Sequence, residues 1–410
     1  MGIITDTKTV LLVKYGEISL RKGNRAFYEQ QIMNTISRKL RGMGNDIRVR
    51  REQGRFLIEE TNGNIDVDAV LERVKYTFGI TGFCICIKTN ARQIEDLQQI
   101  GLEFFSHIAG DKPQSFKVMT KRSDKKYPIK SGDVSALIGG YILDASPKLR
   151  VDVHNPETVL WVEIRNHVYF YINSVIGVGG LPYGSSGKGV LLLSGGLDSP
   201  IAGYLTARRG VEICPIYFHS PPFVSERAAD KVKDLAQVLG RYTGHISVMI
   251  IPFTDVQLYL REHVHEEKLT IFLKRAMMRI ASAYAEKIGA QCLITGDSIG
   301  QVASQTVQSI AAVESAAKYA VLRPLAAMDK QQIIDIARDI GTFPISIRPY
   351  DDCCTLFVAK HPESKPNTAV IERIEAKLEE KLTPLLEQAL AGAEYWNNIP
   401  TRSIDTPTSP

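Results

Sequence analysis

The most constraining feature of this chain is a short stretch of small and polar residues that directly follows an apolar run. Residues 190–193 read Val-Leu-Leu-Leu, and the next six residues are Ser194-Gly195-Gly196-Leu197-Asp198-Ser199. An apolar run bounded in this way predicts a buried strand that ends in a loop. Pro200 follows, and a proline is tolerated in the first turn of a helix because its missing N–H has no partner there. We therefore expect a helix over residues 201–209, with backbone N–H groups at its start that suit a phosphate.

Two better-known phosphate loops do not fit this stretch. A Walker A loop needs Gly-x4-Gly-Lys-[Ser/Thr] after a strand, whereas Gly184-Ser185-Ser186-Gly187-Lys188 has the wrong spacing and precedes the strand. A dinucleotide loop needs Gly-x-Gly-x-x-Gly, which Gly195-Gly196 does not supply. The stretch instead resembles the PP-loop of the ATP pyrophosphatases, which implies cleavage of ATP between the α- and β-phosphates. The alternative is an ordinary strand-to-helix turn capped by Ser or Asp.

Length and composition predict a soluble protein of two or three domains. The chain has 410 residues, of which 44% are hydrophobic and 23% charged. It contains no apolar stretch as long as a membrane span and no signal peptide at its start. Its six cysteines do not form a disulfide framework, so we expect the reducing cytoplasm. Cys84, Cys86, Cys214 and Cys292 lie in apolar runs and are predicted to be buried.

Positive charge is concentrated in the first part of the chain. Residues 1–150 contain 25 Lys and Arg against 17 Asp and Glu, whereas the remainder contains 25 against 28. This imbalance favours a polyanionic partner, although a solvated charged surface is the simpler alternative.

The order of predicted elements in the first half is typical of a ferredoxin-like domain followed by a second α/β module. Strands near residues 10–13, 47–51, 55–59 and 83–88 alternate with helices over 24–40 and 67–76 in the order β-α-β-β-α-β. Further helices are expected over 94–107 and 134–144, with strands over 115–120, 150–153, 159–164 and 168–172.

A glycine-rich linker over residues 174–189 separates this half from a second α/β region. Strands over 190–193, 211–218, 246–251, 291–295 and 320–322 alternate with helices near 200–209, 225–240 and 269–288. This alternation predicts a mostly parallel sheet whose ligand site lies at the carboxyl ends of its strands. A final helix is expected over 369–387, followed by a disordered tail.

Several further motifs, taken in order, resemble the bacterial tRNA 4-thiouridine synthetase (tRNA sulfurtransferase) family over nearly the whole chain. The front carries Lys14-Tyr15-Gly16-Glu17 and Lys22-Gly23-Asn24-Arg25, and residues 116–128 with 151–165 resemble a THUMP domain. The back carries Thr295-Gly296-Asp297-Ser298, Arg323-Pro324-Leu325 and Tyr350-Asp351-Asp352-Cys353. The resemblance implies a ferredoxin-like domain over residues 1–76, a THUMP RNA-binding domain over 77–175 and a PP-loop domain over 176–410.

The resemblance is to the short form of the family. Long members end in a rhodanese domain with its own persulfide cysteine, which links them to thiamine thiazole synthesis, and we do not extend that role to this chain.

The family chemistry implies that ATP adenylates the C4 oxygen of a tRNA uridine and that sulfur then displaces AMP. Ser194, Gly195, Gly196 and Ser199 would bind pyrophosphate, and Asp198 would hold Mg²⁺. The other nucleotide-binding candidates are Leu192, Leu193, Tyr217, Phe218, Lys274, Arg275, Gly296 and Gln305. The alternatives are helix capping for Asp198, core packing for Tyr217 and Phe218, and an exposed helix face for Lys274 and Arg275.

Lys330 and Cys353 complete the catalytic candidates. Lys330 matches a family position at the reacting centre, with helix-start solvation as its alternative. The resemblance implies that a cysteine desulfurase delivers a persulfide to Cys353. Cys354 is either a resolving thiol or a buried residue, and burial is favoured because adjacent cysteines suit neither a strain-free disulfide nor a zinc site.

Two basic stretches are the candidates for tRNA binding. The first is represented by Arg50 and Arg51, and the second by Lys121, Arg122, Lys125 and Lys126. The expected partners are therefore tRNA and a cysteine desulfurase, with no membrane, and a homodimer is left open. The main alternative function is a non-thiolating PP-loop enzyme that adenylates a small molecule, although such an enzyme would not need a basic front half.

Overall fold

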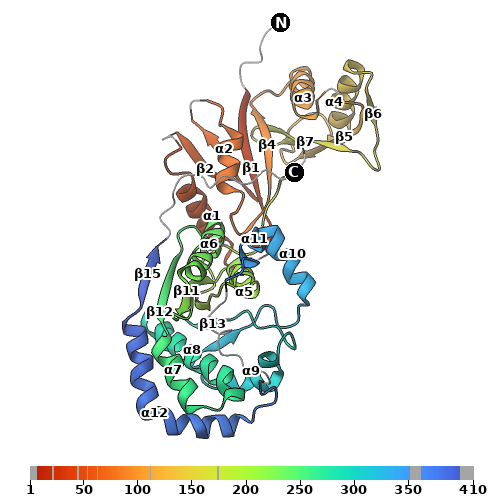
Figure 1. The fold of residues 1–410 in the computed structure, drawn as a ribbon. Coiled ribbons are helices and arrows are strands. Elements are labelled where there is room, and N and C mark those ends of the chain that lie inside the picture. The colour runs from red at the N-terminus through yellow and green to blue at the C-terminus, as the bar shows by residue number, and fades with distance from the viewer. Residues whose placement is uncertain are drawn as a thin grey trace. The chain divides into compact units, whose positions relative to one another are not determined.

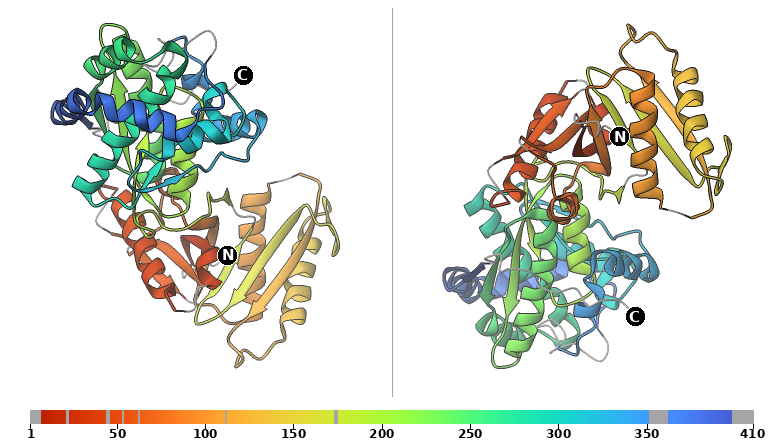
Figure 2. Two further views of the ribbon diagram at one scale, coloured as in Figure 1. Left: turned by 90° about the horizontal axis from the view of Figure 1, so that it is seen from below. Right: turned by 90° about the horizontal axis from the view of Figure 1, so that it is seen from above.

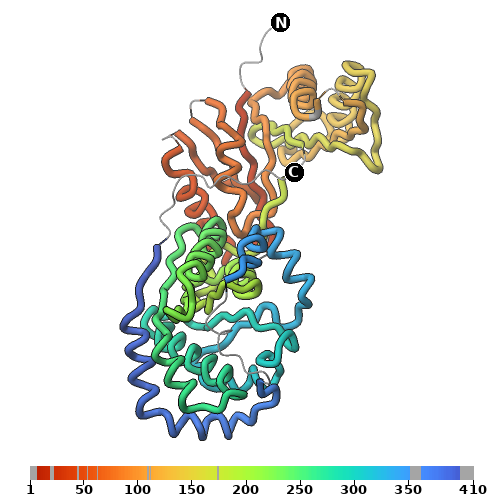
Figure 3. The backbone as a smooth tube through the Cα atoms, viewed as in Figure 1, coloured from red at the N-terminus to blue at the C-terminus, as the bar shows by residue number. Residues whose placement is uncertain are grey.

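The computed structural model of the chain describes residues 7–20, 23–43, 46–52, 54–61, 63–110, 112–172, 175–350 and 362–397. It divides into two compact units, Met1–Leu181 and Pro182–Pro410. The elements of both units are labelled in Figure 1, and the course of the backbone can be followed in Figure 3. Each unit is built around its own sheet.

Unit 1 begins with the predicted ferredoxin-like order. Strand β1 and helix α1 are followed by a hairpin of β2 and β3, then by α2 and β4; their bounds are Thr7–Tyr15, Arg25–Lys39, Ile47–Glu52, Arg55–Glu60, Val67–Val74 and Ile80–Thr89. A short 3-10 helix, Glu17–Leu20, precedes α1. The strands pair in the order β2-β3-β1-β4, all antiparallel, as this fold requires.

The second module of unit 1 extends the same sheet. It consists of α3 (Ile94–Ala109), β5 (Gln114–Arg122), α4 (Ser131–Ala145), β6 (Leu149–Val151), β7 (Thr158–Ile164), β8 (Val168–Tyr171) and β9 (Val175–Ile176). β8 pairs antiparallel with β4, and the order then continues through β7 and β5 to β6. One sheet therefore spans both modules.

The two faces of this sheet carry different chemistry. One face packs against α1 to α4 through two apolar clusters. On the other face, the buried cluster is formed by strand residues alone among the residues described, and it includes Cys84, Cys86, Tyr169 and Tyr171. Because side chains alternate along a strand, Cys84 and Cys86 share this face, and both are buried as predicted.

A buried ion pair lies on this second face and joins the two modules. Arg55 of β3 is 4% exposed and donates to Glu163 of β7 at 2.7 Å. Arg55 also donates to Glu52 at 3.2 Å, and the Tyr171 hydroxyl donates to Glu163 at 2.7 Å. Arg55 lies in the basic stretch of the sequence, but the structure buries it as an internal counter-ion.

Unit 2 is an α/β domain with a six-stranded sheet in the order β14-β13-β10-β11-β12-β15. The strands are β10 (Lys188–Leu192), β11 (Glu212–His219), β12 (Ser247–Pro252), β13 (Cys292–Ile294), β14 (Ala320–Leu322) and β15 (Glu394–Asn397). All neighbouring pairs are parallel except β12 with β15. The mostly parallel sheet was predicted, whereas the antiparallel edge strand β15 was not.

Helices cover both faces of this sheet (Figure 2). Their bounds are α5 Asp198–Arg208, α6 Glu226–Thr243, α7 Thr254–His263, α8 Glu266–Ile288, α9 Val307–Glu314, α10 Lys330–Ile340, α11 Phe343–Ser346 and α12 Thr368–Ala391. A short 3-10 helix, Ala303–Gln305, precedes α9. Helices α5 and α6 pack on the side of Leu191: a Cβ on Gly203 of α5 would lie 2.6 Å from the Leu191 side chain, so any larger residue would force that side chain to shift.

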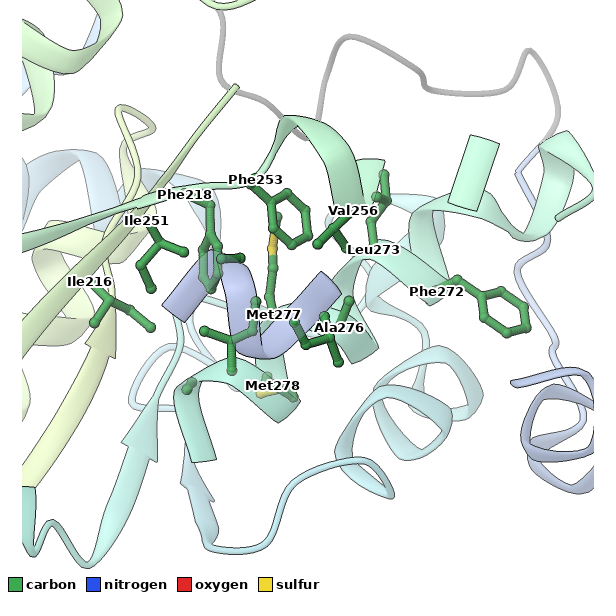
Figure 4. Close-up of a cluster of buried hydrophobic side chains, with 14 of the residues drawn as sticks. Ile216, Phe218, Ile251, Phe253, Val256, Phe272, Leu273, Ala276, Met277 and Met278 are labelled. Atoms are coloured by element: carbon green, nitrogen blue, oxygen red, sulfur yellow. The ribbon is translucent and has the colours of Figure 1, made fainter. Parts of the chain in front are cut away.

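The opposite face of the sheet packs against α7, α8 and α12 in the largest apolar cluster of unit 2 (Figure 4). Phe218 of β11 and Phe253 meet edge to face with ring centres 5.0 Å apart. Met277 of α8 reaches toward Phe253 in Figure 4, and Met278 belongs to the same cluster. This cluster fixes α8 beneath the strand ends, where its polar residues become available to a site.

Several sequence expectations change in detail. α5 begins at Asp198 rather than after Pro200, but Pro200 still lies in its first turn, where no N–H is needed. α7, α9, α10 and α11 were not predicted. α9 and α11 are only eight and four residues long, whereas α10 is clearly amphipathic and begins with a capping box at Asp329 that could have revealed it. Cys214 and Cys292 are half-buried rather than buried. The expected disordered tail lies outside the described residues. In the part of the chain that is described, no helix is long and apolar enough to cross a membrane.

The cross-sheet ion pair makes a prediction about stability. Arg55→Met should lower the free energy of unfolding by about 3–5 kcal/mol, because Glu163 would be left buried without its closest counter-charge. Denaturant unfolding with a probe in unit 1 measures the loss. The control is Arg48→Met, at an exposed position of β2, which should change stability by less than ~0.5 kcal/mol. Equal effects of the two substitutions would contradict the assigned role.

Candidate active site

A pocket opens at the carboxyl ends of β10, β11 and β13 in unit 2. Its lining comes from these strand ends, from the start of α5, from α8 and from the segment after β13; the residues are Leu192, Leu193, Ser194, Asp198, Ser199, Tyr217, Phe218, Lys274, Met277, Met278, Thr295, Gly296, Asp297 and Gln305. This is the edge at which open parallel sheets bind ligands. Most of the residues proposed from the sequence for nucleotide binding are therefore brought together here.

The Ser194–Ser199 loop is closed by its own hydrogen bonds. The Ser194 N–H donates to the Ser199 hydroxyl at 2.8 Å, and the two hydroxyls are 3.0 Å apart. The Gly196 N–H donates to the Ser194 hydroxyl at 3.2 Å. These bonds curl the loop over the amino end of α5, where orphan N–H groups and the helix dipole favour an anion.

Gly296 holds the segment after β13 against this loop. A Cβ at this position would lie 2.7 Å from the Ser199 nitrogen and 2.8 Å from the Asp198 carbonyl carbon. The sequence placed Gly296 among the nucleotide-binding candidates. The structure shows why glycine is needed: the close approach is to the backbone of α5, and it holds two parts of the pocket together.

Asp198 begins α5 and is held by two side chains from distant elements. Lys330, the first residue of α10, donates to Oδ1 at 3.1 Å. Gln301 donates to Oδ2 at 3.0 Å. The side chain of Asp198 is 22% exposed, so its carboxylate can still be reached from the pocket. The structure thus brings together Asp198 and Lys330, two residues that are 132 positions apart in sequence.

Asp297 is a pocket residue that was quoted within a motif but not proposed as a site residue. Lys274 donates to it at 3.2 Å and the Thr295 hydroxyl at 2.9 Å, while Arg323 lies 3.7 Å away. Burial by itself would raise the pKa of Asp297, but Lys274, Thr295 and Arg323 together lower it below its ordinary value. Asp297 follows the carboxyl end of β13, and that position was the available signal.

Met277 and Met278 were also missed. They lie about one helical turn after Lys274 on α8, and with Tyr217 and Phe218 they give the pocket an apolar wall. The helical spacing from Lys274 would have placed them on the same face. An apolar wall beside a phosphate loop suits a flat heterocyclic base.

Arg275 is a correction. It was proposed to neutralise phosphates, but it is 2% exposed and lies outside the pocket. Its guanidinium donates to the carboxylate of Glu375 on α12 at 3.1 Å and to the Ser315 hydroxyl at 2.7 Å. Lys274 faces the pocket and contacts Asp297, whereas Arg275, one position later on α8, points toward α12. Arg275 is a structural residue that fixes α8 against α12.

Cys353 and Cys354 lie outside the described residues, and so does the stretch from Asp351 to His361 that carries them. The described chain ends at Tyr350 before this stretch and resumes at residue 362.

The basic residues of unit 1 that were proposed to bind RNA differ in their surroundings. Arg50 and Arg51 are neighbours on β2 and therefore point to opposite faces: Arg50 pairs with Glu59 at 2.6 Å and Arg51 with Glu29 of α1 at 3.3 Å. Arg122 donates to the carbonyls of Tyr127 and Ile129, so it shapes the loop after β5. Lys121, Lys125 and Lys126 are exposed.

Comparison with known proteins agrees with this architecture. The family described as "Thiamine biosynthesis protein (ThiI)" matches residues 184–380, its ferredoxin-like domain matches residues 10–84, and the THUMP domain matches residues 91–173. A probable tRNA sulfurtransferase from Lachnoclostridium phytofermentans is 46% identical over 93% of this chain and 97% of its own. This chain belongs to the ThiI family. The resemblance found in the sequence is therefore confirmed.

Two further relatives support membership in the ThiI family. A probable tRNA sulfurtransferase from Acetivibrio thermocellus is 43% identical over 94% of this chain and 98% of its own. A solved 4-thiouridine synthetase, in complex with RNA and with bound ATP, is 36% identical over 95% of this chain and 99% of its own, with a TM-score of 0.86. The predicted combination of ferredoxin-like, THUMP and PP-loop domains is confirmed.

The ion pair of Asp297 makes a prediction about pH. In Lys274→Met the largest compensating charge is gone, so burial raises the pKa of Asp297. A carboxyl whose pKa is lowered in the folded protein contributes stability that is lost as pH falls through that pKa. In the variant, the loss of activity and of stability on acidification should therefore begin at a higher pH. pH–rate profiles of ATP turnover check the shift. Lys318→Met, at a largely exposed lysine of unit 2, should leave the profile in place.

Proposed function

We propose that this chain is an ATP-dependent tRNA sulfurtransferase, which adenylates a tRNA uridine and replaces its C4 oxygen with sulfur to give 4-thiouridine. The observation that carries the proposal is the end-to-end likeness to a 4-thiouridine synthetase that binds RNA and ATP, combined with a pocket whose phosphate loop, acidic residue and lysine are already assembled. The curated relatives named tRNA sulfurtransferase support the same reaction.

ATP would occupy the pocket with its base against the apolar wall and its outer phosphates on the Ser194–Ser199 loop. This arrangement leaves the α-phosphorus between the loop and the polar residues Lys274 and Lys330. The uridine O4 attacks the α-phosphorus, the bond from that phosphorus to the bridging oxygen breaks, and pyrophosphate leaves with the electron pair. The N3 proton of uridine is lost as the O4–phosphorus bond forms. Lys330 is a candidate to neutralise charge at this centre.

Magnesium fits the residues that are present. Asp198 offers one partly exposed carboxylate beside the phosphate loop. Among the described residues no three His, Cys, Asp or Glu side chains converge on one point, and Mg²⁺ is commonly held by one or two carboxylates together with phosphates and water. When bound, it would supply charge neutralisation for the departing pyrophosphate. Asp198 would hold it after exchanging its contact with Lys330.

Sulfur transfer is proposed to proceed through Cys353. The terminal sulfur of a Cys353 persulfide forms a bond to C4, the C4–O bond breaks, and AMP leaves with the electron pair. An S–S bond then joins Cys353 to the new thiouridine sulfur, and a thiol must supply two electrons to cleave it. An external thiol suits this step better than Cys354, because adjacent cysteines form a strained disulfide. A cysteine desulfurase in the cytoplasm would supply the persulfide.

We place tRNA binding mainly in unit 1. Its sequence is basic, and Lys125 and Lys126 on the loop after β5 are exposed. Recognition of a folded RNA through phosphates and shape is the expected mode.

The proposed reaction predicts the products of single variants. Asp198→Ala should lower pyrophosphate release by on the order of 100-fold or more, since a charge that stabilises the leaving group is removed.

Cys353→Ser should leave pyrophosphate release near normal while 4-thiouridine formation fails, because serine cannot carry a persulfide. Chromatography of nucleotides and digested tRNA measures both. ADP as the main product, or normal thiolation by Cys353→Ser, would overturn the proposal.

The RNA-binding role of unit 1 predicts a salt effect. Replacing Lys125 and Lys126 by alanine should weaken tRNA binding and reduce the slope of log K against log salt by about 0.7–0.9 for each phosphate that the variant no longer neutralises. A matched control replaces the exposed Lys377 and Lys381 of α12, where we expect the slope to be unchanged. Filter binding over a salt series makes the comparison. A larger effect at α12 would move the RNA site to unit 2.

A further inference from the structure

Lys231 of α6 is a buried cation that the steps above do not use. It is 4% exposed, on the face of α6 that packs into unit 2. Its ammonium donates to the main-chain carbonyl of Arg348 at 2.9 Å and to that of Tyr350 at 3.3 Å. A buried ammonium is tolerated only where such acceptors replace water. An apolar side chain would fill this buried position without the cost of burying a charge. The presence of a lysine therefore indicates that its two hydrogen bonds to the chain at 348–350 have a role.

A second contact holds the same stretch of chain to the same helix. Asp234 lies one turn after Lys231, and its carboxylate pairs with the guanidinium of Arg348. Lys231 thus binds the main chain of residues 348–350, and Asp234 binds the side chain of Arg348. A stretch held at both its main chain and its side chain has little freedom to move relative to α6.

The stretch held in this way begins at the phosphate loop. Helix α11 ends at Ser346, whose hydroxyl donates to the carbonyl of Gly196 at 3.3 Å. Two residues later, Arg348 meets Lys231 and Asp234. Residues 346–350 therefore form a fixed connection from the phosphate loop to α6.

This connection ends three residues before Cys353. Chain geometry allows at most ~11 Å between the Cα atoms of Tyr350 and Cys353. On the far side of that cysteine, residues 363 and 364 make a Lys268–Glu363 ion pair at 2.6 Å and a bond from the Thr306 hydroxyl to the Ser364 carbonyl. Among the residues that the structure describes, the contact nearest before the cysteine is the one between Lys231 and the Tyr350 carbonyl.

We propose that Lys231 is a positioning residue for sulfur transfer: by holding the carbonyls of Arg348 and Tyr350, it fixes where the chain leaves for Cys353 relative to the phosphate loop. The inference rests on the proposed function of Cys353. Lys231 touches no reacting atom. Its removal should therefore separate the two half-reactions, with adenylation retained and sulfur transfer impaired.

The test uses the full chain with tRNA, ATP, cysteine and a cysteine desulfurase, and measures pyrophosphate and 4-thiouridine in the same sample. Lys231→Met should release pyrophosphate at close to the wild-type rate but form 4-thiouridine on the order of 10- to 100-fold more slowly. The ratio of the two products does not depend on how much of the variant is folded. The control is Lys233→Met on the same helix, whose lysine pairs with Asp230 and whose ratio should match wild type.

A second arm replaces cysteine and desulfurase with sodium sulfide. Hydrosulfide can attack C4 of the adenylated uridine itself, displacing AMP without Cys353, so Lys231→Met should then form 4-thiouridine at the wild-type rate. Asp234→Asn, which weakens the second contact only, should raise the ratio of pyrophosphate to 4-thiouridine with cysteine as the source, but by less.

Three outcomes would overturn the inference. Parallel loss of both products in Lys231→Met would mean that the lysine supports the ATP site. An unchanged ratio would mean that the contact is not needed, and a defect that persists with sulfide would place it outside the persulfide step. If wild type releases pyrophosphate but makes no 4-thiouridine under any sulfur supply, the proposed function itself fails, and that result is distinguishable from the other three.

Discussion

The hydrogen bond from the Ser194 N–H to the Ser199 hydroxyl is the interaction on which the site depends. It closes the loop between β10 and α5, so that the loop's remaining N–H groups gather at the positive end of a helix. Gly296 then brings the end of β13 against the backbone of Asp198 and Ser199. Two segments distant in sequence are thereby packed into one corner, and the pocket forms around it.

The charged side chains of the pocket form ion pairs with one another. Asp198 is paired with Lys330, and Asp297 with Lys274. Each lysine keeps its neighbouring carboxylate compensated in a partly buried place, where an unpaired charge would be unfavourable. A triphosphate and a divalent cation bring charges of the same two signs, so partners can be exchanged without exposing an isolated charge. Such an arrangement is prepared for a polyanionic ligand rather than for an apolar one.

The same pairing of charges appears in unit 1. Arg55 and Glu163 join two modules across one sheet, and the neighbouring Arg50 and Arg51 are divided between its faces. A run of arginines in sequence therefore makes several different structural contacts, while Lys125 and Lys126 on the loop after β5 are exposed. The positive charge of the unit is a better guide to its partner than the position of any single arginine.

The sequence by itself determined the order of the main strands and helices, because long periodic segments and the Ser194–Ser199 stretch carry their own signals. It also determined which strand ends would meet, since parallel strands share one edge. It could not separate Lys274 from Arg275, because the direction of each side chain depends on which face of α8 is buried. Nor could it supply Gln301 or Lys231, whose partners lie more than a hundred residues away. Helices and strands can be predicted from neighbouring residues because their hydrogen bonds and periodicity are local. Which side chains pair with one another depends on tertiary packing, which brings α5, α6, α8 and α10 together around one sheet.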